Sequence, residues 1–421
     1  MRNVDAAGLG IGDDHPPRIM GVLNVSSESP YDPSVYDDPG EAAEYVDTEL
    51  IGEGADIVDV GLESANKDLD VLSADQELDR LDTAIETLES TSGDAVWSIE
   101  TRYHEVADAA LSRGFDMVND ICGFADPEMP RVCREHDAAV SKMASPPDLE
   151  RPGAIEDVDD IYEALSLNGF TDKTILDPAF GGWSEAKTHA DDRETFHRLR
   201  EFRGYGRPLL VSINRKSFLK TLAGRSTAEA LPVSLAATSM AVERGAHVVR
   251  THDVAETRDA ALVGAEFARD RTRTGATGDV SVEELDVTTV REAERHLDRL
   301  RADRTVAGDA VVRTYELGGL SDEAVGALRA ATTSPGPHSG ARSGPGAAGN
   351  AAFVLAESPG ATATSASVTD GGTDDGRTSP ETGRRGLLVG TPRAIEASKS
   401  EATGVSPALD AALDAIDAGS I

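Results

Sequence analysis

Residues 248–254 read VVRTHDV: apolar residues that predict a buried strand lead directly into an arginine, a histidine and an aspartate. The chain carries a formal net charge of -36, so most of its surface repels anions. An Arg-x-His pair at the end of a strand therefore predicts a local anion site in an acidic protein. Arg250 and His252 alternate along the strand, so both side chains should point the same way.

Eight short β-branched runs, of which this is the last, alternate with amphipathic helical segments. Eight strand–helix units in succession predict a (β/α)₈ TIM barrel, a fold of the α/β class. The alternative is a doubly wound open sheet, which favours a Gly-rich turn after an early strand, and Asn24-Val25-Ser26 offers none. The runs lie at 18–25, 55–61, 96–101, 116–121, 138–143, 173–178, 208–213 and 247–253.

The pattern changes after the barrel, which we expect to span residues 17–272. We predict a helical and strand connector at 273–332, a low-complexity and flexible segment at 333–386, and a short strand and helix at 387–421. This C-terminal extension is either a small accessory domain split by a disordered insert or a mostly disordered tail. No chemistry is assigned to it.

The amino-acid composition limits the classes of function that the protein can have. With 76 acidic against 40 basic residues, the surface disfavours nucleic acid and anionic membranes and suits a cytoplasm with molar salt, as in a halophile. No run of about 18 apolar residues predicts a membrane span. The start of the chain has no signal-peptide pattern, so a cytoplasmic location is expected. Cys122 and Cys133 have neither metal-ligand nor redox spacing and are expected to be reduced.

Polar side chains follow every predicted strand. Because the carboxyl ends of barrel strands meet at one rim, these groups should form one site, with phosphate bound near the last two strands. Mixed carboxylates, amides and cations suit a polar heterocycle that bears an anionic group. The residues are Asn24, Asp59, Glu63, Ser64, Glu100, Asn119, Lys142, Met143, Asp177, Asn214, Arg215, Lys216, Arg250 and His252.

Seven motifs in order between residues 17 and 270 resemble those of the dihydropteroate synthases, a pterin-binding TIM-barrel family. They are IMGVLNVSSES, ADIVDVGLES, SIET, MVNDICGFADPEM, ILDPAFGG, INRKSFL and VVRTHDV. The resemblance implies a transferase of folate biosynthesis that joins 4-aminobenzoate to 6-hydroxymethyl-7,8-dihydropterin pyrophosphate. The products would be 7,8-dihydropteroate and pyrophosphate.

The resemblance also implies roles for individual residues. Asn119, Asp177 and Lys216 would bind the pterin, with Glu100 in place of the usual aspartate and Met143 lining the pocket. Asn24, Arg250 and His252 would hold the pyrophosphate, with Mg²⁺ bridging Asn24 and phosphate oxygens. The catalytic set would be Asp177, Lys216, Arg250 and His252, and the substrate-binding set adds Ser64, Lys67, Asn214 and Arg215.

The chain departs from the family pattern in its loops. Residues 64–68 read SANKD where the family has Ser-Thr-Arg-Pro-Gly, so Lys67 would replace part of the lost positive charge. Asn214 replaces a serine. These changes leave open a related barrel that uses another arylamine or carries a methyl-pterin, and a non-catalytic pterin-binding homologue. The expected partners are the two small-molecule substrates and, by analogy, a second copy in a homodimer.

Overall fold

The structure, a computed structural model, describes residues 3–26, 32–63, 71–181, 186–277, 280–333, 351–355 and 384–416. Its contacts divide the chain into two compact units, Met1–Glu284 and Leu285–Ile421. The domain boundaries expected from the sequence stay predictions. Each unit is described by itself.

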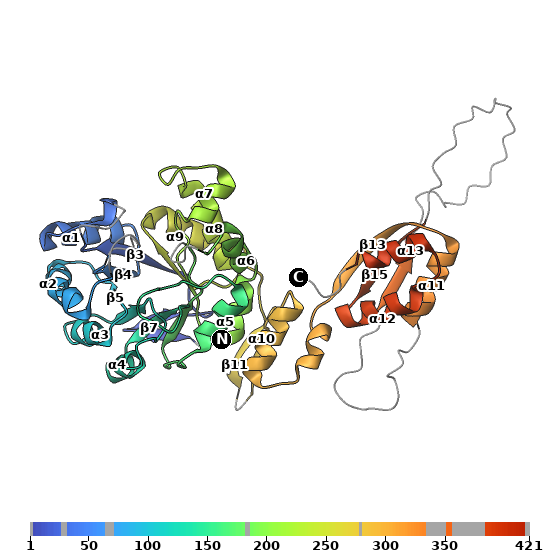
Figure 1. Cartoon of the computed structure of the whole chain (residues 1–421), viewed down its shortest axis with the longest axis horizontal. Coiled ribbons are helices and arrows are strands. Elements are labelled where there is room, and N and C mark those ends of the chain that lie inside the picture. Colours follow the sequence, from blue (N-terminus) through green and yellow to red (C-terminus); the bar gives the residue numbers. More distant parts are fainter. Residues whose placement is uncertain are drawn as a thin grey trace, which may run out of the picture. The chain divides into compact units, whose positions relative to one another are not determined.

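The first unit is built on eight parallel strands in the order β8-β7-β6-β5-β4-β3-β10-β9, with the helices of this unit around them (Figure 1). Each strand coincides with one of the eight runs seen in the sequence, so the (β/α)₈ barrel is confirmed. The strands are β3 (Arg18–Asn24), β4 (Ile57–Gly61), β5 (Val96–Thr101), β6 (Met117–Asp120), β7 (Ala139–Met143), β8 (Thr174–Asp177), β9 (Leu210–Val211) and β10 (Val248–Thr251).

The two edge strands of this sheet, β8 and β9, meet to close the barrel. Leu176 bridges Leu209 in parallel, and the Leu176 amide donates to the Pro208 carbonyl at 2.9 Å. Between the other neighbours, two to five residues pair in register, for example Met20 to Asn24 of β3 with Ile57 to Gly61 of β4. The junction between β8 and β9 therefore has the fewest paired residues of any junction between neighbouring barrel strands.

Helices follow the strands, and several begin at residues suited to capping. Ser73 and Gln76 form a reciprocal capping box at the start of α2, and Thr188 and Asp191 do the same at α6, satisfying amides that a helix leaves without a partner. The helical elements are α1 (Pro39–Tyr45), continued by the π-turn η2 (Val46–Ile51), α2 (Ala74–Ser90), α3 (His104–Leu111), α4 (Met129–Glu135), α5 (Val158–Ser166), α6 (His189–His197), α7 (Ser217–Ala223), α8 (Leu231–Glu243) and α9 (Val254–Glu266), with short 3₁₀ turns at η1 (Asp32–Ser34) and η3 (Leu199–Tyr205).

The base of the barrel is apolar and closed. A hairpin of β1 (Val4–Ala6) and β2 (Leu9–Ile11), which the sequence analysis did not anticipate, packs its Val4, Ala6 and Ile11 against one inward residue from each barrel strand. Those eight are Met20, Ile57, Val96, Met117, Ala139, Ile175, Leu210 and Val248. A second, larger apolar shell lies between the strands and the helices. With the lower half filled, inward side chains further along the strands are left to form a site at the other end.

Beneath this hairpin lies a buried ionic network that also ties distant segments together. Asp13 accepts hydrogen bonds from His247 Nε2 at 3.1 Å and Arg271 Nη2 at 2.8 Å, and Arg203 lies 3.8 Å away. Burial raises the pKa of Asp13, but His247 and Arg271 outweigh it and hold that pKa well below its usual range. Asp13 is therefore ionised and joins the N-terminal segment to the start of β10 and the end of the barrel.

The second unit has its own core. Strands β13 and β14 flank β15 in an antiparallel sheet, although residues between them in sequence lie outside the described part of the chain. Leu317, Leu328, Leu388 and Ile395 are among the residues buried between this sheet and its helices. The compact accessory domain is therefore the alternative that these contacts favour. Its elements are α10 (Val290–Leu300), η4 (Arg304–Asp309), β13 (Arg313–Leu320), α11 (Asp322–Thr333), β14 (Ala352–Leu355), β15 (Arg384–Gly390), α12 (Pro392–Ala402) and α13 (Pro407–Asp414), and a further hairpin, β11 (Arg273–Thr277) with β12 (Val280–Glu283), ends the first unit.

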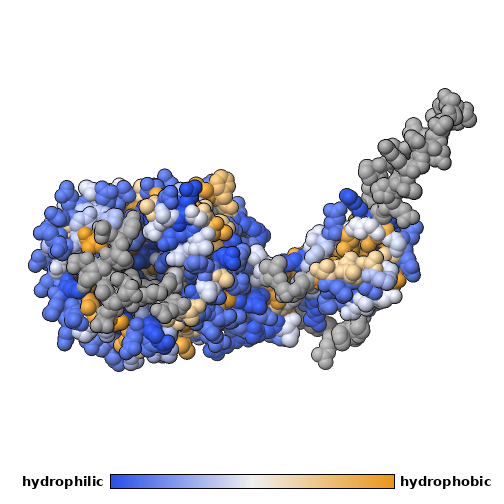
Figure 2. All heavy atoms as spheres, turned by 45° about the horizontal axis from the view of Figure 1, so that its top comes forward, coloured by the Kyte–Doolittle hydropathy of each residue, from blue (hydrophilic) through white to orange (hydrophobic). Residues whose placement is uncertain are grey.

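Figure 2 shows that hydrophilic residues dominate the visible surface of the first unit, in line with its charge. Within the described ranges, we find no helix long and apolar enough to cross a membrane. Cys122 and Cys133 are buried free thiols.

Candidate functional site

The middle of the barrel interior is a network of charged and polar side chains. Alternate residues of a strand point to the same side, so Asp59, Ser98, Asn119 and Arg250 all face inward, one step above the apolar base. Arg250 Nε donates to Asp59 Oδ2 at 2.7 Å, and Asn119 Nδ2 donates to the same oxygen at 3.0 Å. Ser98 Oγ donates to Asp59 Oδ1 at 2.7 Å. Both carboxylate oxygens of Asp59 thus accept hydrogen bonds, and these bonds fix the orientation of Arg250 and Asn119.

Glu100 lies one step nearer the rim and forms the second contact of Arg250. Arg250 Nη2 donates to Glu100 Oε2 at 2.6 Å, and Asn119 Nδ2 lies 3.4 Å from that oxygen. Burial raises the pKa of Glu100, and Arg250 opposes that effect. Burial likewise lowers the pKa of Arg250, but Glu100 and Asp59 raise it above its ordinary value. The guanidinium therefore stays charged and holds two carboxylates together.

Asp177 ends β8 and is buried at the same level of the barrel. Its Oδ1 accepts the backbone amide of Ala179 at 2.7 Å, and Ala179 itself adopts a left-handed conformation with φ of 59°. Burial raises the pKa of Asp177 to about 6, against the opposing influence of that amide and of Lys216 and Arg250. A carboxyl group of this kind changes its ionisation near neutral pH.

Lys216 precedes α7 and reaches toward the β8 loop. A Cβ added to Gly181 would lie 3.0 Å from Lys216 Nζ, so glycine leaves the space that the ammonium group occupies. Among the residues that the structure describes, Lys216 Nζ has no hydrogen-bond or ion-pair partner. Burial lowers its pKa, with Arg250 adding to the effect and Asp177 opposing it. Lys216 is thus an amine donor whose interaction with Asp177 favours its charged form.

The neighbours of Lys216 are arranged differently from what the sequence suggested. Arg215 makes a two-pronged ion pair with Asp253 at 2.8 Å for each contact, and it donates to the carbonyls of Thr227 and Ala228. Asn214 Nδ2 also donates to Asp253, at 2.9 Å. These contacts tie the β9 loop to the β10 loop. A substrate-binding role for Asn214 and Arg215 stays a prediction, and the geometry favours a structural role.

A hydrogen-bonded chain links the loops after β3 and β10. Asn24 Nδ2 donates to Ser34 Oγ at 3.1 Å, and Ser34 Oγ lies 3.1 Å from His252 Nδ1. Burial, and then Arg250, lower the pKa of His252 to about 3. The imidazole is therefore neutral at pH 7 in this structure, and it would offer an anion a hydrogen bond rather than a charge. Asn24 and His252 are thus linked through Ser34, and Arg250 is close enough to influence His252; a role for the three in binding pyrophosphate stays a prediction.

The donor set near Asn24 can be compared with what Mg²⁺ requires. The amide nitrogen is engaged by Ser34, so the remaining ligand atom is the neutral Oδ1, and the nearby carboxylates Asp59 and Glu100 are paired with Arg250. Mg²⁺ prefers oxygen ligands and commonly keeps several waters while sharing substrate phosphate oxygens. One amide oxygen fits such a cation only when the cation arrives with an anionic substrate.

A separate cluster lies elsewhere in the described part of the first unit. The ligand atoms of His104, Glu105 and Asp126 lie within 4.8 Å of one another, and their contacts tie the start of α3 to the β6 loop.

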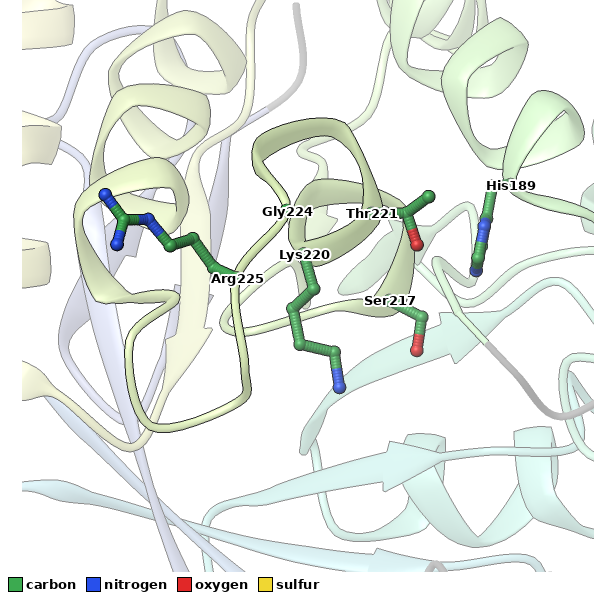
Figure 3. Close-up of a pocket in the computed structure, with 6 residues that line it drawn as sticks. All are labelled: His189, Ser217, Lys220, Thr221, Gly224 and Arg225. Carbon is green, nitrogen blue, oxygen red and sulfur yellow. The ribbon is translucent and has the colours of Figure 1, made fainter.

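A hollow of about 400 Å³ lies between the start of α6 and α7. Ser217 and Thr221 lie on the side of α7 that faces His189, whereas the Arg225 side chain extends away from them (Figure 3). Lys220 also lines the hollow. Basic and hydroxyl groups dominate this lining, which favours an anionic or hydrogen-bonding ligand in an otherwise acidic protein.

Some expected residues cannot be placed, and some important ones were missed. Ser64 and Lys67 lie outside the described residues, whereas Met143 ends β7 beside Asp177 and is buried. Asp59 was expected at the rim but was given no role in substrate binding or catalysis, and Ser34 and Ser141 were not predicted. The buried Ser141 Oγ has no hydrogen-bond partner within the described structure. The period-two alternation that pointed Arg250 inward would have identified Asp59 and Ser141 as well.

Fold and site together define the class of protein: a (β/α)₈ barrel whose upper interior holds paired carboxylates, cations and amides suited to a small polar ligand. Similarity searches agree with this description. The sequence model of the family described as pterin binding enzyme matches residues 20–252, more than half of the chain. The chain belongs to the pterin-binding enzyme family.

Individual relatives point the same way. Over 268 residues the chain is 35% identical to a probable bifunctional folylpolyglutamate synthase/dihydropteroate synthase of Haloferax volcanii, covering 60% of this chain and 31% of that protein. It is 31% identical to the Bacillus subtilis dihydropteroate synthase, covering 56% of this chain and 83% of the relative. The Coxiella burnetii dihydropteroate synthase, solved with pteroic acid, superposes with a TM-score of 0.54 at 27% identity, covering 63% of this chain and 98% of that one.

These matches differ in how much of each relative they span. The chain spans about a third of the length of the bifunctional relatives that it matches, but nearly all of the solved structures. A dihydropteroate synthase from Thermus thermophilus, solved with 4-aminobenzoate, gives a TM-score of 0.51 at 29% identity, with 63% of this chain and 100% of that chain covered.

Proposed function

We propose that the protein is a dihydropteroate synthase, a transferase that joins 4-aminobenzoate to 6-hydroxymethyl-7,8-dihydropterin pyrophosphate. The observation that carries the proposal is the set of the buried Asn119 and Asp177 and the half-buried Glu100 and Lys216 around Arg250. The pterin ring has an amidine edge rich in donors and an opposite edge with acceptors. Buried carboxylates and an amide suit the first edge, and the Lys216 ammonium suits the second.

Charge placement supports the reaction type. Loss of pyrophosphate leaves positive character on the pterin methylene group, which the carboxylates of Asp177 and Glu100 would stabilise without moving. Arg250 would stabilise the departing anion, and His252 and Asn24 would orient it by hydrogen bonds. Binding pyrophosphate would require Arg250 to share its donors between the anion and its present partners, Asp59 and Glu100.

Mg²⁺ is part of the proposal as a cation that arrives with the substrate at Asn24. When bound, it would neutralise charge on the leaving pyrophosphate. The single neutral oxygen of Asn24 is consistent with weak binding of the metal alone. We therefore expect metal affinity to depend on the presence of the pyrophosphate group.

The hollow beside α7 is the proposed site for the acceptor. Ser217, which lines it, follows Lys216 directly in the chain, and Ser217 and Lys220 offer a hydroxyl and an ammonium group for the carboxylate of 4-aminobenzoate. The arylamine nitrogen is weakly basic, so it would attack the methylene carbon without a strong general base. The residues that line this hollow would contribute by positioning 4-aminobenzoate for attack.

The test is pyrophosphate release by the purified chain in molar KCl with Mg²⁺, with and without 4-aminobenzoate. Release that depends on 4-aminobenzoate and yields dihydropteroate is the expected result. Two lysines four residues apart give matched variants: Lys216→Met should weaken pterin binding, and Lys220→Met should raise KM for 4-aminobenzoate alone. A folded protein that binds the pterin but releases no pyrophosphate would refute the proposal and favour a non-catalytic homologue.

Release with a different arylamine alone would instead assign the chain to a related pathway, as the altered loop at residues 64–68 allows. The remaining parts of the proposal follow from composition and analogy: a cytoplasmic, halophilic protein, supported by the net charge of -36, and a homodimer. Activity as a function of KCl concentration tests the first, and the molar mass in solution tests the second.

A further inference from the structure

Two charged side chains outside the site lie buried, Lys187 just before α6 and Asp192 in the first turn of α6. The Lys187 side chain is 1% exposed and the Asp192 side chain 5% exposed, and their Nζ and Oδ1 atoms are 3.5 Å apart. Burying a charge is costly unless it is paired and hydrogen-bonded. Neither residue belongs to the set assigned to substrate above, so their burial needs another explanation.

The contacts of this pair lead to the backbone around Asp177. Lys187 Nζ donates to the Ala179 carbonyl at 2.7 Å, and Asp192 Oδ1 accepts the Gly181 amide at 3.1 Å. Ala179 has a φ of 59°, a left-handed conformation that is unfavourable for alanine and persists only where other contacts hold it. The pair thus holds both ends of the Ala179–Gly181 segment.

That segment contacts two residues of the site directly. The Ala179 amide donates to Asp177 Oδ1 at 2.7 Å, and Gly181 provides the space for Lys216 Nζ. Phe180, between them, is buried against Phe196 of α6 and Phe218 of α7. A shift of Ala179 would move a hydrogen bond of Asp177, and a shift of Gly181 would move the wall against Lys216.

We propose that Lys187 and Asp192 are positioning residues, a buried clamp that fixes Asp177 and Lys216 in the geometry that binds the pterin. The inference rests on the proposed function, because it assigns the pterin to Asp177 and Lys216. Lys187 acts through Ala179, and Asp192 acts through Gly181. Their own side chains would not touch the substrate.

The electrostatics agree with this geometry. Burial lowers the pKa of Lys187, and Asp192 opposes that effect. Lys187 is also one of the cations, with Lys216 and Arg250, that favour the ionised form of Asp177. Loss of Lys187 should therefore raise the pH at which Asp177 ionises, a result that a merely structural role would not give.

The experiment is calorimetric binding of 6-hydroxymethyl-7,8-dihydropterin to the full chain between pH 5 and pH 8. Lys187→Met is expected to weaken binding about tenfold at pH 7 and to move the midpoint of the acid limb upward. Lys173→Met is the matched control, because Lys173 also contacts a carbonyl and a carboxylate, those of Asp137, but lies at the opposite end of β8. The control should bind like the wild type.

A double variant, Lys187→Met with Asp192→Asn, separates charge from position. It removes both charges and leaves the Ala179 carbonyl without its donor, so binding should stay weak. Restored binding in the double variant, or unchanged binding and pH midpoint in Lys187→Met, would overturn the inference. Should Lys187→Met fail to fold, Asp192→Ala gives the same test through Gly181. A wild-type chain that does not bind the pterin would refute the proposed function itself.

Discussion

Asp177 gives the sharpest prediction, because its ionisation falls within the pH range where the protein can be assayed. Burial raises the pKa of this carboxyl to about 6, and a pterin amidine edge requires the ionised form as its acceptor. With a pKa near 6, about nine-tenths of the molecules carry the charge at pH 7 and about one-tenth at pH 5. Pterin affinity should therefore fall about tenfold between these values, or about 1.4 kcal/mol.

The assay is calorimetric titration with 6-hydroxymethyl-7,8-dihydropterin at intervals of pH, in the wild type and three variants. Asp177→Asn should bind weakly and lose the pH dependence. Asp120→Asn is a matched control: Asp120 is buried and its pKa is also raised to about 6 by burial, but it accepts the amides of Cys122 and Phe124 and belongs to no part of the proposed pterin site. Asp120→Asn should keep the pH dependence.

Glu100 must be tested by a separate variant, because burial raises the pKa of Glu100 as well and this residue contacts Arg250. Glu100→Gln should lower the affinity while the midpoint near pH 6 remains. The reasoning about Asp177 is refuted if Asp177→Asn retains the wild-type pH dependence, and still more clearly if Asp120→Asn abolishes it.

Three further predictions concern Arg250, Asp13 and Glu77. Arg250→Met should cost about 3–5 kcal/mol of unfolding free energy by leaving Asp59 and Glu100 without a counter-charge, and should reduce kcat about 10²–10³-fold, as measured by denaturation and by pyrophosphate release. Asp13→Asn should cost about 3 kcal/mol, seen as a Tm lower by about 6–12 °C, while the exposed neighbour variant Asp14→Asn should shift Tm by less than about 2 °C; equal shifts would contradict the buried network. Burial raises the pKa of Glu77 to about 8, so its folded form favours the proton, and stability should fall as pH rises from about 4.5 to 8, by at most about 1.4 kcal/mol per pH unit. Glu77→Gln should flatten that slope in thermal unfolding, and an unchanged slope would exclude Glu77 as its source.

The barrel could be predicted from the sequence because its strands are short and hydrophobic and each ends in a polar group. The strand ends led us to expect Arg250, Asn119 and Asp177 at one rim, and in the structure Arg250 and Asn119 both contact Asp59, while Asp177 ends β8. Asp59 was expected at the rim but was given no role, because a single carboxylate within an apolar run gives no sign of its partners. Those partners, Arg250 and Asn119, are 191 and 60 residues away in the chain.

Other features depend on contacts that have no local pattern. Ser34 joins Asn24 to His252 from the short turn η1, and Lys187 reaches Ala179 from eight residues further along the chain. In the second unit, β13 and β15 pair although 63 residues separate Leu320 and Arg384 in the sequence. Such pairings are decided by packing over long separations, which composition and periodicity do not encode.

The junction between β8 and β9 has a consequence for how the barrel opens. Transient separation of strands should begin where the fewest hydrogen bonds must break, so the Leu176 amide should exchange its hydrogen with solvent sooner than the amides of β4 or β5. Asp177 extends from one side of this junction, and the chain reaches Lys216 from the other. A pterin that contacts both groups would connect the two strands across the junction. Slower exchange at Leu176 in the presence of the pterin would then report occupancy of the site without any turnover.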